Sequence, residues 1–600
     1  MKNKFISYII AVSFGLLLIL NSCEKKLDIS PLNILTADQI FASEDAVVAY
    51  LASLYNNMQK EDFMYSPASF LPNTTDEAIN CFNDQGTNIG DGTNDAWWHY
   101  DYVRYVNDLI SKVPSSKLSE LSKSTVLGEA YFLRAYYYFS MVKRYGGIPI
   151  VKKVLTYTGS NLAELQVTRN KEQEVYDFIA SDLDSAALLL PKTNVIGRAT
   201  KGAALAYKSR AMLYAGSSAK YGSVQLGGIL GIPATDANKY WQAAYDAANA
   251  LIALNQYSLY SKSTDKVANF AGLFLDGTTS NTEQILSEYY LYGYKSHQWD
   301  CYVIPFGIRG PNGFGARIDP TLDLVEQYEY VDGTPGTLTA AKIGTPASPV
   351  YYTNAPDLFN NKDPRFLATI IVPFSSFKGS VIDIQSGIYD QGVKVEGAYT
   401  ALYNPSTHSI SATGTIHVGG LSGPTGTEVT QTGFNLKKYL DPNMAQALVT
   451  SSGTTGSTQP YMMIRYGEVL LNFAEAAVEL GKISDAKDKV NMIRTRAGIA
   501  LLSDADITID RVRKERNNEL AFENQRWYDM RRWHTSDILF SNWWPRMLKT
   551  YYDLQQQKYR FEIGLNAGRY SKTFNPKVYY ERITPSELTL NPNLVQNPGY

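Results

Sequence analysis

Residues 464–497, IRYGEVLLNFAEAAVELGKISDAKDKVNMIRTRA, predict two helices joined by a tight turn at Gly481. Apolar side chains recur every three or four residues over 464–480 and over 484–497, which is the spacing of a helix with one buried face. Small side chains lie where the two helices would cross: Ala474, Ala477 and Ala486. A close helical hairpin of this kind is the building unit of tetratricopeptide-like arrays.

Helical spacing also dominates the first half of the chain. It predicts helices over 47–58, 129–145, 175–190, 201–215 and 240–254. The second of these ends at Gly146-Gly147, with Pro149 just beyond, which is typical of a helix C-terminus. Paired with their neighbours, the helices make about four hairpin units separated by long insertions. A last helix, rich in charges, is expected over 509–534.

The middle of the chain has a different character. From 255 to 460 it is rich in Gly, Ser, Thr, Asn and Tyr, with short β-like runs such as 368–372, and the glycine-rich stretch 414–432 is expected to form an exposed loop. The predicted fold is therefore mainly α. Tetratricopeptide-like helix pairs form a scaffold, which carries a loop-rich, irregular cap containing a few short β-strands.

The first residues of the chain form an export signal. Two lysines precede an apolar run over 5–20, which is shorter than the ~20 residues that a membrane-spanning helix needs. Leu20-Asn21-Ser22-Cys23 resembles a bacterial lipobox, in which the thiol of Cys23 takes a diacylglycerol. We expect residues 1–22 to be a lipoprotein signal peptide and 23–35 to be the lipidated cysteine with its tether, so that acyl chains anchor the protein on a membrane. The alternative is an ordinary signal peptide in which Cys23 is incidental.

The composition limits the classes of partner. With 56 Lys and Arg against 58 Asp and Glu, the net charge is −2, so we expect no nucleic-acid binding. The 44 tyrosines outnumber the 23 Phe and 8 Trp together. A tyrosine has an apolar ring and a polar hydroxyl, so it suits both partly solvated binding grooves and helical cores. Cys81 and Cys301 are too few for a disulfide scaffold; they either pair with each other or stay as buried thiols.

Motifs for catalysis are missing from the sequence. The five histidines never occur three or four residues apart, so no helical zinc pair exists. The sequence also contains no G-x-S-x-G elbow, no phosphate-binding glycine loop and no dinucleotide-binding fingerprint. We therefore expect a protein that is not an enzyme and holds no cofactor and no metal. A pair of carboxylates suited to glycoside hydrolysis and a loop calcium site stay open, because neither leaves a sequence pattern.

Aromatic residues in polar loops are the strongest sign of a binding site. Trp97 and Trp98 follow a stretch rich in Gly, Asn and Asp, and Trp299 and Tyr302 lead towards Arg309. Sugar rings have an apolar C–H face and a rim of hydroxyls, so they are bound by flat aromatic rings flanked by polar side chains. The alternative is that these tryptophans anchor their loops to the scaffold.

Several ordered motifs resemble those of the SusD/RagB family of Bacteroidetes outer-membrane lipoproteins. They are EAYFLRA at 129–135 running to YGGIP at 145–149, RYGEVLL at 465–471, IRTRAG at 493–498, RKER at 513–516, RWYDMRRW at 526–533, the Asp-Pro-Arg within 361–366, and NPNLVQNPGY at 591–600. The resemblance extends from Cys23 to Tyr600. It implies an N-terminal SusD-like helical region over 36–260 and a C-terminal region over 261–600 that holds the cap and the last helical hairpin.

The resemblance also implies a function in nutrient uptake and polysaccharide utilisation. A family member is lipid-anchored on the outer face of the outer membrane and covers a TonB-dependent SusC-like barrel as its lid. It usually passes on an oligosaccharide or another glycan without covalent change. Because some members serve other nutrients, the alternatives are a peptide or other nutrient carrier, a surface glycoside hydrolase and a scaffold for proteins only.

The starch-binding members of the family suggest which residues contact glycan. Their aromatic arc corresponds to Trp97 or Trp98 together with Trp299 or Tyr302, and Asp76 takes the place of an acidic residue that bonds sugar hydroxyls. We expect Arg309 to supply further hydrogen bonds. The glycan-binding set is therefore Asp76, Trp97, Trp98, Trp299, Tyr302 and Arg309.

The arginines of the signature motifs are expected to be structural. Arg134, Arg494 and Arg496 lie on predicted helices, with Glu475 or Glu519 as candidate partners. Because arginine suits planar ion pairs, we expect buried or interhelical charge pairs rather than ligand contacts.

Overall fold

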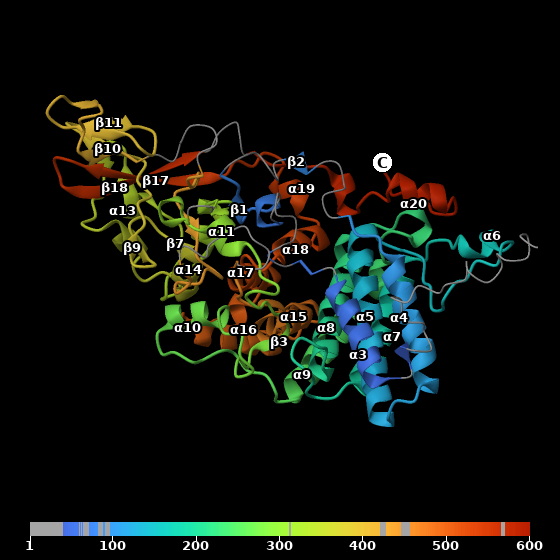
Figure 1. Ribbon diagram of the computed structural model, residues 1–600. Coiled ribbons are helices and arrows are strands. Elements are labelled where there is room, and N and C mark those ends of the chain that lie inside the picture. Colours follow the sequence, from blue (N-terminus) through green and yellow to red (C-terminus); the bar gives the residue numbers. More distant parts are fainter. Residues whose placement is uncertain are drawn as a thin grey trace, which may run out of the picture.

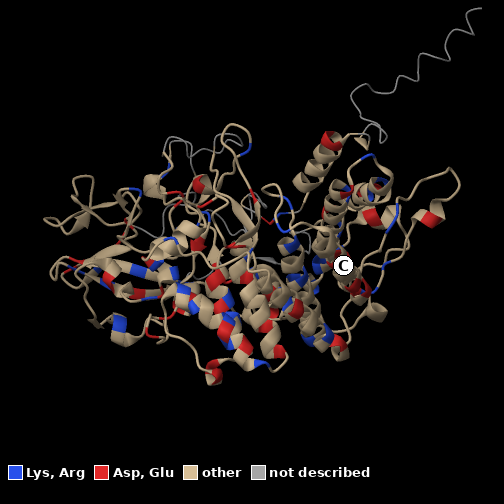
Figure 2. Cartoon of the chain, turned by 90° about the horizontal axis from the view of Figure 1, so that it is seen from below, with Lys and Arg blue, Asp and Glu red and all other residues tan. Residues whose placement is uncertain are grey.

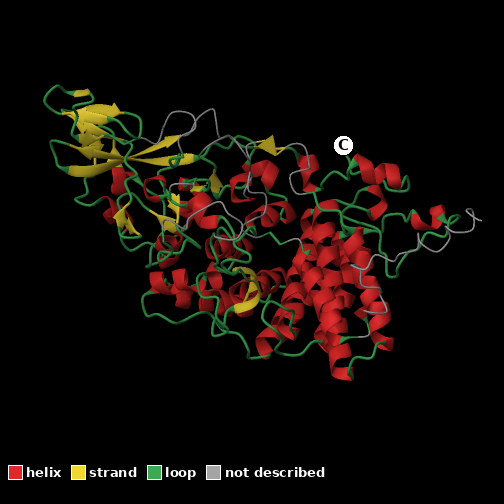
Figure 3. Ribbon diagram, viewed as in Figure 1, coloured by secondary structure: helices red, strands yellow, loops and turns green. Residues whose placement is uncertain are grey.

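The computed structural model describes residues 40–41, 43–58, 60–61, 63, 71–81, 88–89, 96–310, 314–419, 428–445, 456–565 and 571–600. The predicted signal peptide, Cys23 and the tether lie outside these residues. Long helices are gathered in one half of the molecule and most of the strands at its opposite end (Figures 1 and 3). None of the described helices combines the length and the apolar character needed to cross a membrane.

The helical half is a scaffold of long helices packed side by side. Its members are α3 (Glu44–Asn56), α4 (Tyr100–Lys112), α5 (Glu120–Tyr145), α7 (Glu172–Leu189), α8 (Lys201–Tyr221) and α9 (Ala237–Ala253). α5 packs on α7, α7 on α8 and α8 on α9, as adjacent helices do in a tetratricopeptide-like array. Gly216 allows the last of these contacts, because a methyl group added there would lie 2.6 Å from the ring of Trp241.

The predicted helical hairpin is present as α15 (Tyr466–Glu479) and α16 (Ile483–Ala497). The side chains of Ala474, Ala477 and Ala486 are fully buried. The hairpin begins two residues later than expected, because 461–465 form strand β16 (Tyr461–Arg465), which pairs with β3 (Gln284–Glu288). α15 packs against α9 and so continues the scaffold into the C-terminal region.

The single helix expected over 509–534 is wrong. The chain forms α17 (Ile509–Leu520) and α18 (Arg526–Arg532), and Phe522 and Asn524 between them have positive φ angles of 61° and 59°. Contacts with distant residues hold this turn: the Lys438 ammonium donates to the Ala521 carbonyl, and the Phe522 N–H donates to the Glu77 carboxylate. The apolar spacing of the local sequence does not reveal these distant partners, so it does not predict the break between the two helices.

The cap combines short strands with loops. Its largest sheet has the order β11 (Val393–Glu396), β10 (Gly387–Asp390), β17 (Arg546–Asp553) and β18 (Lys558–Leu565). A three-stranded sheet contains β12 (Leu402–Asn404), β13 (Ser409–Ile410) and β14 (Ile416–His417). The expected β-like run at 368–372 contains β7 (Ile370–Ile371), paired with β15 (Asn435–Leu436). The hairpin β17–β18 was not expected, and it brings a late segment of the chain into the cap.

Short elements complete the described chain. The helices are α6 (Leu162–Leu165), α10 (Lys266–Leu273), α11 (Trp299–Val303), α12 (Leu322–Gln327), α13 (Ala340–Ile343), α14 (Pro364–Thr369), α19 (Ser536–Leu539) and α20 (Pro585–Leu590). The strands are β1 (Ala78–Ile79), β2 (Asn88–Ile89), β4 (Asp319–Pro320), β5 (Gly344–Thr345), β6 (Ser348–Pro349), β8 (Ser376–Phe377), β9 (Ser380–Val381) and β19 (Thr573–Phe574).

A buried cluster of ion pairs joins the cap to the C-terminal helices. This arginine cluster consists of Arg365, Arg465, Arg494 and Arg496 with Glu283, Glu515, Glu519 and Glu523. Arg465 is 1% exposed, and its guanidinium lies 2.5 Å from Glu283, 2.8 Å from Glu519 and 2.8 Å from Glu523. Acidic and basic residues alternate along the central helices (Figure 2). The surrounding guanidinium groups hold the pKa of Glu519 well below its ordinary value despite burial.

The ion pairs expected for the signature arginines are confirmed, with some different partners. Arg134 donates two hydrogen bonds to Asp182 of α7, at 2.7 and 2.8 Å. Arg494 pairs with Glu515 at 2.8 Å, and Arg496 pairs with Glu519 as expected. Glu475 instead accepts from Arg532 and Trp533.

The two described cysteines do not pair. Cys81 and Cys301 are both free and buried, and the Cys81 thiol donates to the Gly315 carbonyl at 3.3 Å. Burial raises the pKa of both thiols. Within the described ranges, no group of three or more His, Cys, Asp or Glu side chains is placed to hold a metal ion.

Candidate functional site

Asp76, predicted to bond sugar hydroxyls, is buried in an ion pair. Its two carboxylate oxygens accept from Nε and Nη2 of Arg526, at 2.8 Å each. The side chain is buried, yet the guanidinium outweighs the effect of burial and lowers the pKa of Asp76. The Thr321 hydroxyl donates to the Asp76 carbonyl at 2.6 Å. The residue therefore ties the start of β1 to α18, and this pair occupies its carboxylate.

Trp97 and Trp299 are also in the core. Trp97 is 5% exposed and packs against Tyr137 of α5, with ring centroids 5.8 Å apart. Trp299 is 2% exposed, lies 5.0 Å from the ring of Phe63, and donates its indole N–H to the Lys438 carbonyl at 3.0 Å. In this conformation neither ring has a face open to a ligand, which fits the alternative role of anchoring loops.

Tyr302 and Arg309 belong to a surface group that we call the aromatic platform. It consists of Tyr302, Phe306 and Phe314 with Arg309, Arg317 and Glu428. The rings of Tyr302 and Phe314 are stacked, with centroids 4.9 Å apart and planes within 3°. Both rings are half-buried. Because the rings are stacked, each covers one face of the other, and an outer face of the pair is the flat apolar surface that a pyranose ring can cover.

Two guanidinium groups lie over rings of the platform. The Arg317 guanidinium lies 5.1 Å from the ring of Phe314, and that of Arg309 lies 4.2 Å from the ring of Phe306. Glu428 pairs with both arginines, and its contact with Arg317 is 2.6 Å. These ion pairs bring two guanidinium groups and one carboxylate together beside the rings of the platform.

Backbone hydrogen bonds fix the platform in place. Tyr302 is in α11, and the N–H of Arg317 donates to the Tyr302 carbonyl at 3.0 Å. The N–H of Ala316 donates to the Ile304 carbonyl at 3.1 Å, so the segment that carries Phe314 runs along the end of the helix. β1 and β4 pair behind it, with Ala78 opposite Pro320. The stacked rings therefore lie on a supported surface rather than on a free loop.

A hollow of about 270 Å³ adjoins the platform at Phe306. Its lining includes the ring of Tyr399 and the polar side chains of Asp383, Gln385 and Asn435. The buried amide nitrogen of Asn435 has no hydrogen-bond partner among the described residues. An amide donor and a carboxylate beside two aromatic rings are the groups that bind sugar hydroxyls.

His417 fixes one wall of this hollow. Its Nδ1 lies 2.7 Å from the Asp383 carboxylate, and its Nε2 contacts the Tyr399 carbonyl. Because both partners only accept, both ring nitrogens must carry a proton for the two hydrogen bonds to form together. The carboxylate accordingly raises the pKa of His417.

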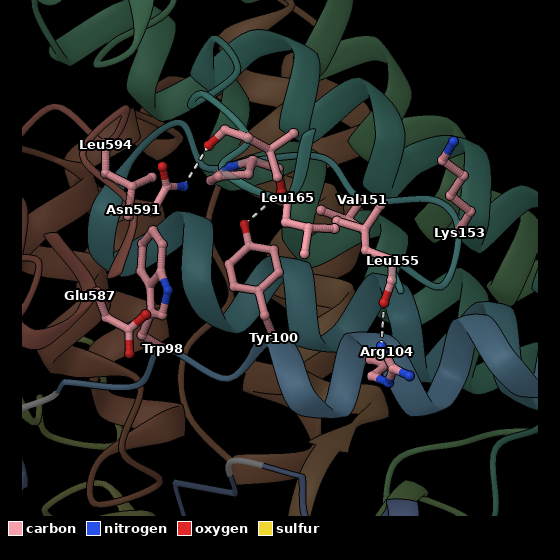
Figure 4. A pocket seen from close by; sticks show the side chains of 12 residues that line it. Trp98, Tyr100, Arg104, Val151, Lys153, Leu155, Leu165, Glu587, Asn591 and Leu594 are labelled. Carbon is pink, nitrogen blue, oxygen red and sulfur yellow. Dashed lines mark hydrogen bonds between the residues drawn. The ribbon is translucent and has the colours of Figure 1, made fainter. Parts of the chain in front are cut away.

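Trp98 lies elsewhere, in a second pocket built from other elements. This pocket has a volume of about 310 Å³ and lies between the start of α4, the segment 149–167 and the C-terminal residues 587–594 (Figure 4). No described hydrogen bond or ring contact links Trp98 to Tyr302 or Arg309. Of the six predicted residues, Asp76, Trp97 and Trp299 are buried. Tyr302 and Arg309 belong to the platform, and Trp98 lies in the other pocket.

The predicted set lacked four platform residues, Phe306, Phe314, Arg317 and Glu428, and the hollow residues Asp383, Gln385, Tyr399 and Asn435. Phe306, Phe314 and Arg317 had a signal, because Phe306 and Arg309 repeat the spacing of Phe314 and Arg317. A phenylalanine followed three residues later by an arginine places a guanidinium beside the ring in both cases. Tyr399 and Glu428 come from distant segments and have no such local signal.

Comparisons with known proteins cover nearly the whole chain. Residues 282–600 match the model of the SusD family, and residues 24–213 match a model described as starch-binding, associating with the outer membrane. SusD-like protein P38 of Formosa agariphila is 23% identical over 558 residues, or 88% of this chain and 91% of that protein.

Solved structures have the same fold. A SusD-like protein from Bacteroides fragilis superposes with a TM-score of 0.69 at 24% identity, covering 95% of this chain and all of that one. A SusD-like carbohydrate-binding protein, also from Bacteroides fragilis, superposes with a TM-score of 0.65 at 22% identity, covering 93% of this chain and all of that one. The mainly helical scaffold with its loop-rich cap is therefore shared by this group.

Proposed function

Because this chain belongs to the SusD family, we propose that it captures an oligosaccharide or polysaccharide at the cell surface and delivers it to a SusC-like TonB-dependent transporter. It acts as the lid of that outer-membrane barrel and leaves the glycan chemically unchanged. The carbohydrate binding of a structural neighbour and the starch-binding description of the N-terminal match support this proposal. The lipid anchor is Cys23, and the mature chain divides near residue 260 into the two regions expected from the sequence.

The aromatic platform is the observation that carries the proposal. An outer face of the stacked pair Tyr302–Phe314 offers the flat surface, and the guanidinium groups of Arg309 and Arg317 lie over the neighbouring rings of Phe306 and Phe314. The hollow beside Phe306 extends the surface with acceptors and an amide donor. We therefore assign glycan stacking to Tyr302 and Phe314. Asp76, Trp97 and Trp299 anchor the segments that carry them.

Affinity electrophoresis tests this assignment. A soluble form, residues 24–600, is run through gels that contain laminarin, amylopectin, xylan or polygalacturonate. We expect at least one polysaccharide to retard it and the double variant Tyr302→Ala/Phe314→Ala to lose about tenfold or more in affinity, because the stacking ring and the ring that supports it are both removed. Tyr294→Ala, at a tyrosine that is 82% exposed and lines neither the hollow nor the pocket beside Trp98, is the matched control. Equal retardation of the double variant and the wild type would contradict the assignment.

Three further measurements test the alternatives, the lid role and the lipid anchor. Incubation of the protein with a polysaccharide that retards it should release no new reducing ends, whereas a surface glycoside hydrolase would release them. Co-purification of the full-length protein with its barrel from outer membranes tests the lid role. Cys23→Ser should remove the lipid anchor and shift the protein to the soluble fraction. Retardation by none of the polysaccharides would favour a peptide or other nutrient as cargo.

A further inference from the structure

The pocket beside Trp98 has an apolar interior and polar edges. Trp98 and Tyr100 form one wall at the start of α4, and Val151 and Leu165 lie across from them (Figure 4). Leu594, which is buried, closes one end of the pocket. Its volume of about 310 Å³ is at the small end of the range for ligand sites, which suits one or two sugar units rather than a long chain.

Hydrogen bonds within the walls keep this pocket open. The Tyr100 hydroxyl donates to the Pro149 carbonyl at 2.6 Å, and the Asn591 amide donates to the Val167 carbonyl at 2.8 Å. The Arg104 guanidinium donates to the Leu155 carbonyl at the far side. Each wall is thus fixed to another part of the chain, so the protein loses little conformational entropy when a ligand binds.

Three polar groups at the edge of the pocket have no partner. In the described part of the chain, no hydrogen bond or ion pair involves the indole N–H of Trp98, the carboxylate of Glu587 or the ammonium of Lys153. Glu587 is only half exposed to solvent, and this partial burial raises its pKa. None of these atoms is among the fully buried ones, so water can solvate them in the empty pocket, and a donor and an acceptor that stay available at one cavity suit a polar ligand.

We propose that this pocket is a second saccharide site, separate from the aromatic platform. Trp98 and Tyr100 contact the apolar face of a sugar ring, Glu587 accepts hydrogen bonds from its hydroxyls, and the indole N–H donates to a ring or hydroxyl oxygen. Figure 4 places Glu587 beside the indole and Lys153 at the opposite side. The choice of a saccharide rests on the proposed function, whereas the site itself rests on the geometry of the pocket.

A polymer held at both sites should bind more tightly than one held at the platform alone, because the second contact is intramolecular. In affinity electrophoresis with the same four polysaccharides, Glu587→Gln and Trp98→Phe should each weaken retardation several-fold, and Trp98→Ala by about tenfold. Trp544→Phe, at another half-buried tryptophan, is the matched control and should leave the mobility unchanged. Melting temperatures separate a binding defect from loss of folding. Retardation of Glu587→Gln and Trp98→Phe equal to that of the wild type would overturn the proposal.

A second measurement detects ligand binding in the pocket directly, from the NMR signal of Trp98. The protein contains eight tryptophans, so 5-fluorotryptophan labelling gives a small set of ¹⁹F resonances in which Trp98→Phe identifies that of Trp98. Maltose, laminaribiose, xylobiose and digalacturonate are titrated in turn into the Tyr302→Ala/Phe314→Ala variant. A saturable shift of the Trp98 resonance with one of them supports the site even when the platform is disabled. No shift with any of the four overturns it, whereas absence of polysaccharide retardation in the wild type contradicts the proposed function.

Discussion

The scaffold and the cap of this protein are stabilised in different ways. In the scaffold, neighbouring helices such as α7, α8 and α9 bury continuous apolar faces against each other. In the cap, strands are short, and the junction with the C-terminal helices depends on the arginine cluster. Arg465 and Glu283, which pair in this cluster, are 182 residues apart in the chain. The scaffold therefore follows from local patterns, whereas the junction of the cap includes buried polar contacts between residues that are distant in the chain.

Arg465→Met should have the largest effect on stability. It leaves three buried carboxylates without their shared guanidinium, and breaking a buried ion pair costs about 3–5 kcal/mol in free energy of unfolding. Urea unfolding followed by circular dichroism measures the loss. Lys239→Met removes an exposed ion pair with Asp177 and should cost less than about 1 kcal/mol. A loss of less than 1 kcal/mol in free energy of unfolding for Arg465→Met would contradict the stabilising role of the arginine cluster at the junction.

Arg134→Met breaks a single buried pair inside the scaffold, and we expect about 3 kcal/mol, the lower end of the same range. Burial already raises the pKa of Asp182, so without Arg134 this carboxyl can be buried as the neutral acid. A group with a raised pKa in the folded state stabilises folding at low pH and loses that effect as the pH rises. The variant should therefore be closer to wild type at pH 5 than at pH 8. An equal loss at both pH values would contradict this account.

Gly216→Ala tests close helix packing in the scaffold. Alanine favours a helix by about 1 kcal/mol over glycine, but its methyl group would lie 2.6 Å from the ring of Trp241, and overpacking costs about 1–3 kcal/mol. We expect a net loss of about 1 kcal/mol in thermal unfolding. Gly272→Ala in α10 is the matched control, because its methyl group meets only an ordinary contact at 3.4 Å and should stabilise the helix.

The smallest effect is expected from His417 in the cap. Its raised pKa means that the imidazolium contributes stability below the ordinary histidine value of about 6.5, and that this contribution is lost as the pH rises through the folded-state pKa. His417→Gln should therefore melt below the wild type at pH 5.5 and match it at pH 9. NMR titration of the histidine ring protons gives the pKa directly. A wild-type pKa of 6.5 or lower would contradict the double hydrogen bond.

Most of the scaffold could be predicted from the sequence. Apolar spacing located α3, α5, α7, α8 and α9, and Gly146 marked the end of α5. The break at 521–525 was missed because its causes, Lys438 and Glu77, are distant in sequence. Strand β17 was missed because its burial does not alternate strictly, so the period of two that signals a strand is weak.

The binding site was only partly predictable. The rule that aromatic residues in polar loops bind sugars led to Tyr302, which lies in the platform, and equally to Trp299, which is buried. The two residues lie three positions apart in one short helix, α11, and the local sequence does not tell which ring turns inward. The difference comes from Phe63 and the Lys438 carbonyl, which enclose Trp299 and lie far away in the chain.

The buried cysteines make this protein well suited to site-specific labelling. A soluble form that begins after Cys23 has only the thiols of Cys81 and Cys301, which are enclosed and have raised pKa values. Since the thiolate is the form that reacts with maleimides, both should react slowly in the folded protein. Two cysteines, introduced at the exposed positions Tyr294 in the cap and Leu188 in the scaffold, would therefore carry a donor and an acceptor dye with little labelling of the native thiols. Energy transfer between the two dyes would then follow movement of the cap against the scaffold as glycan is added.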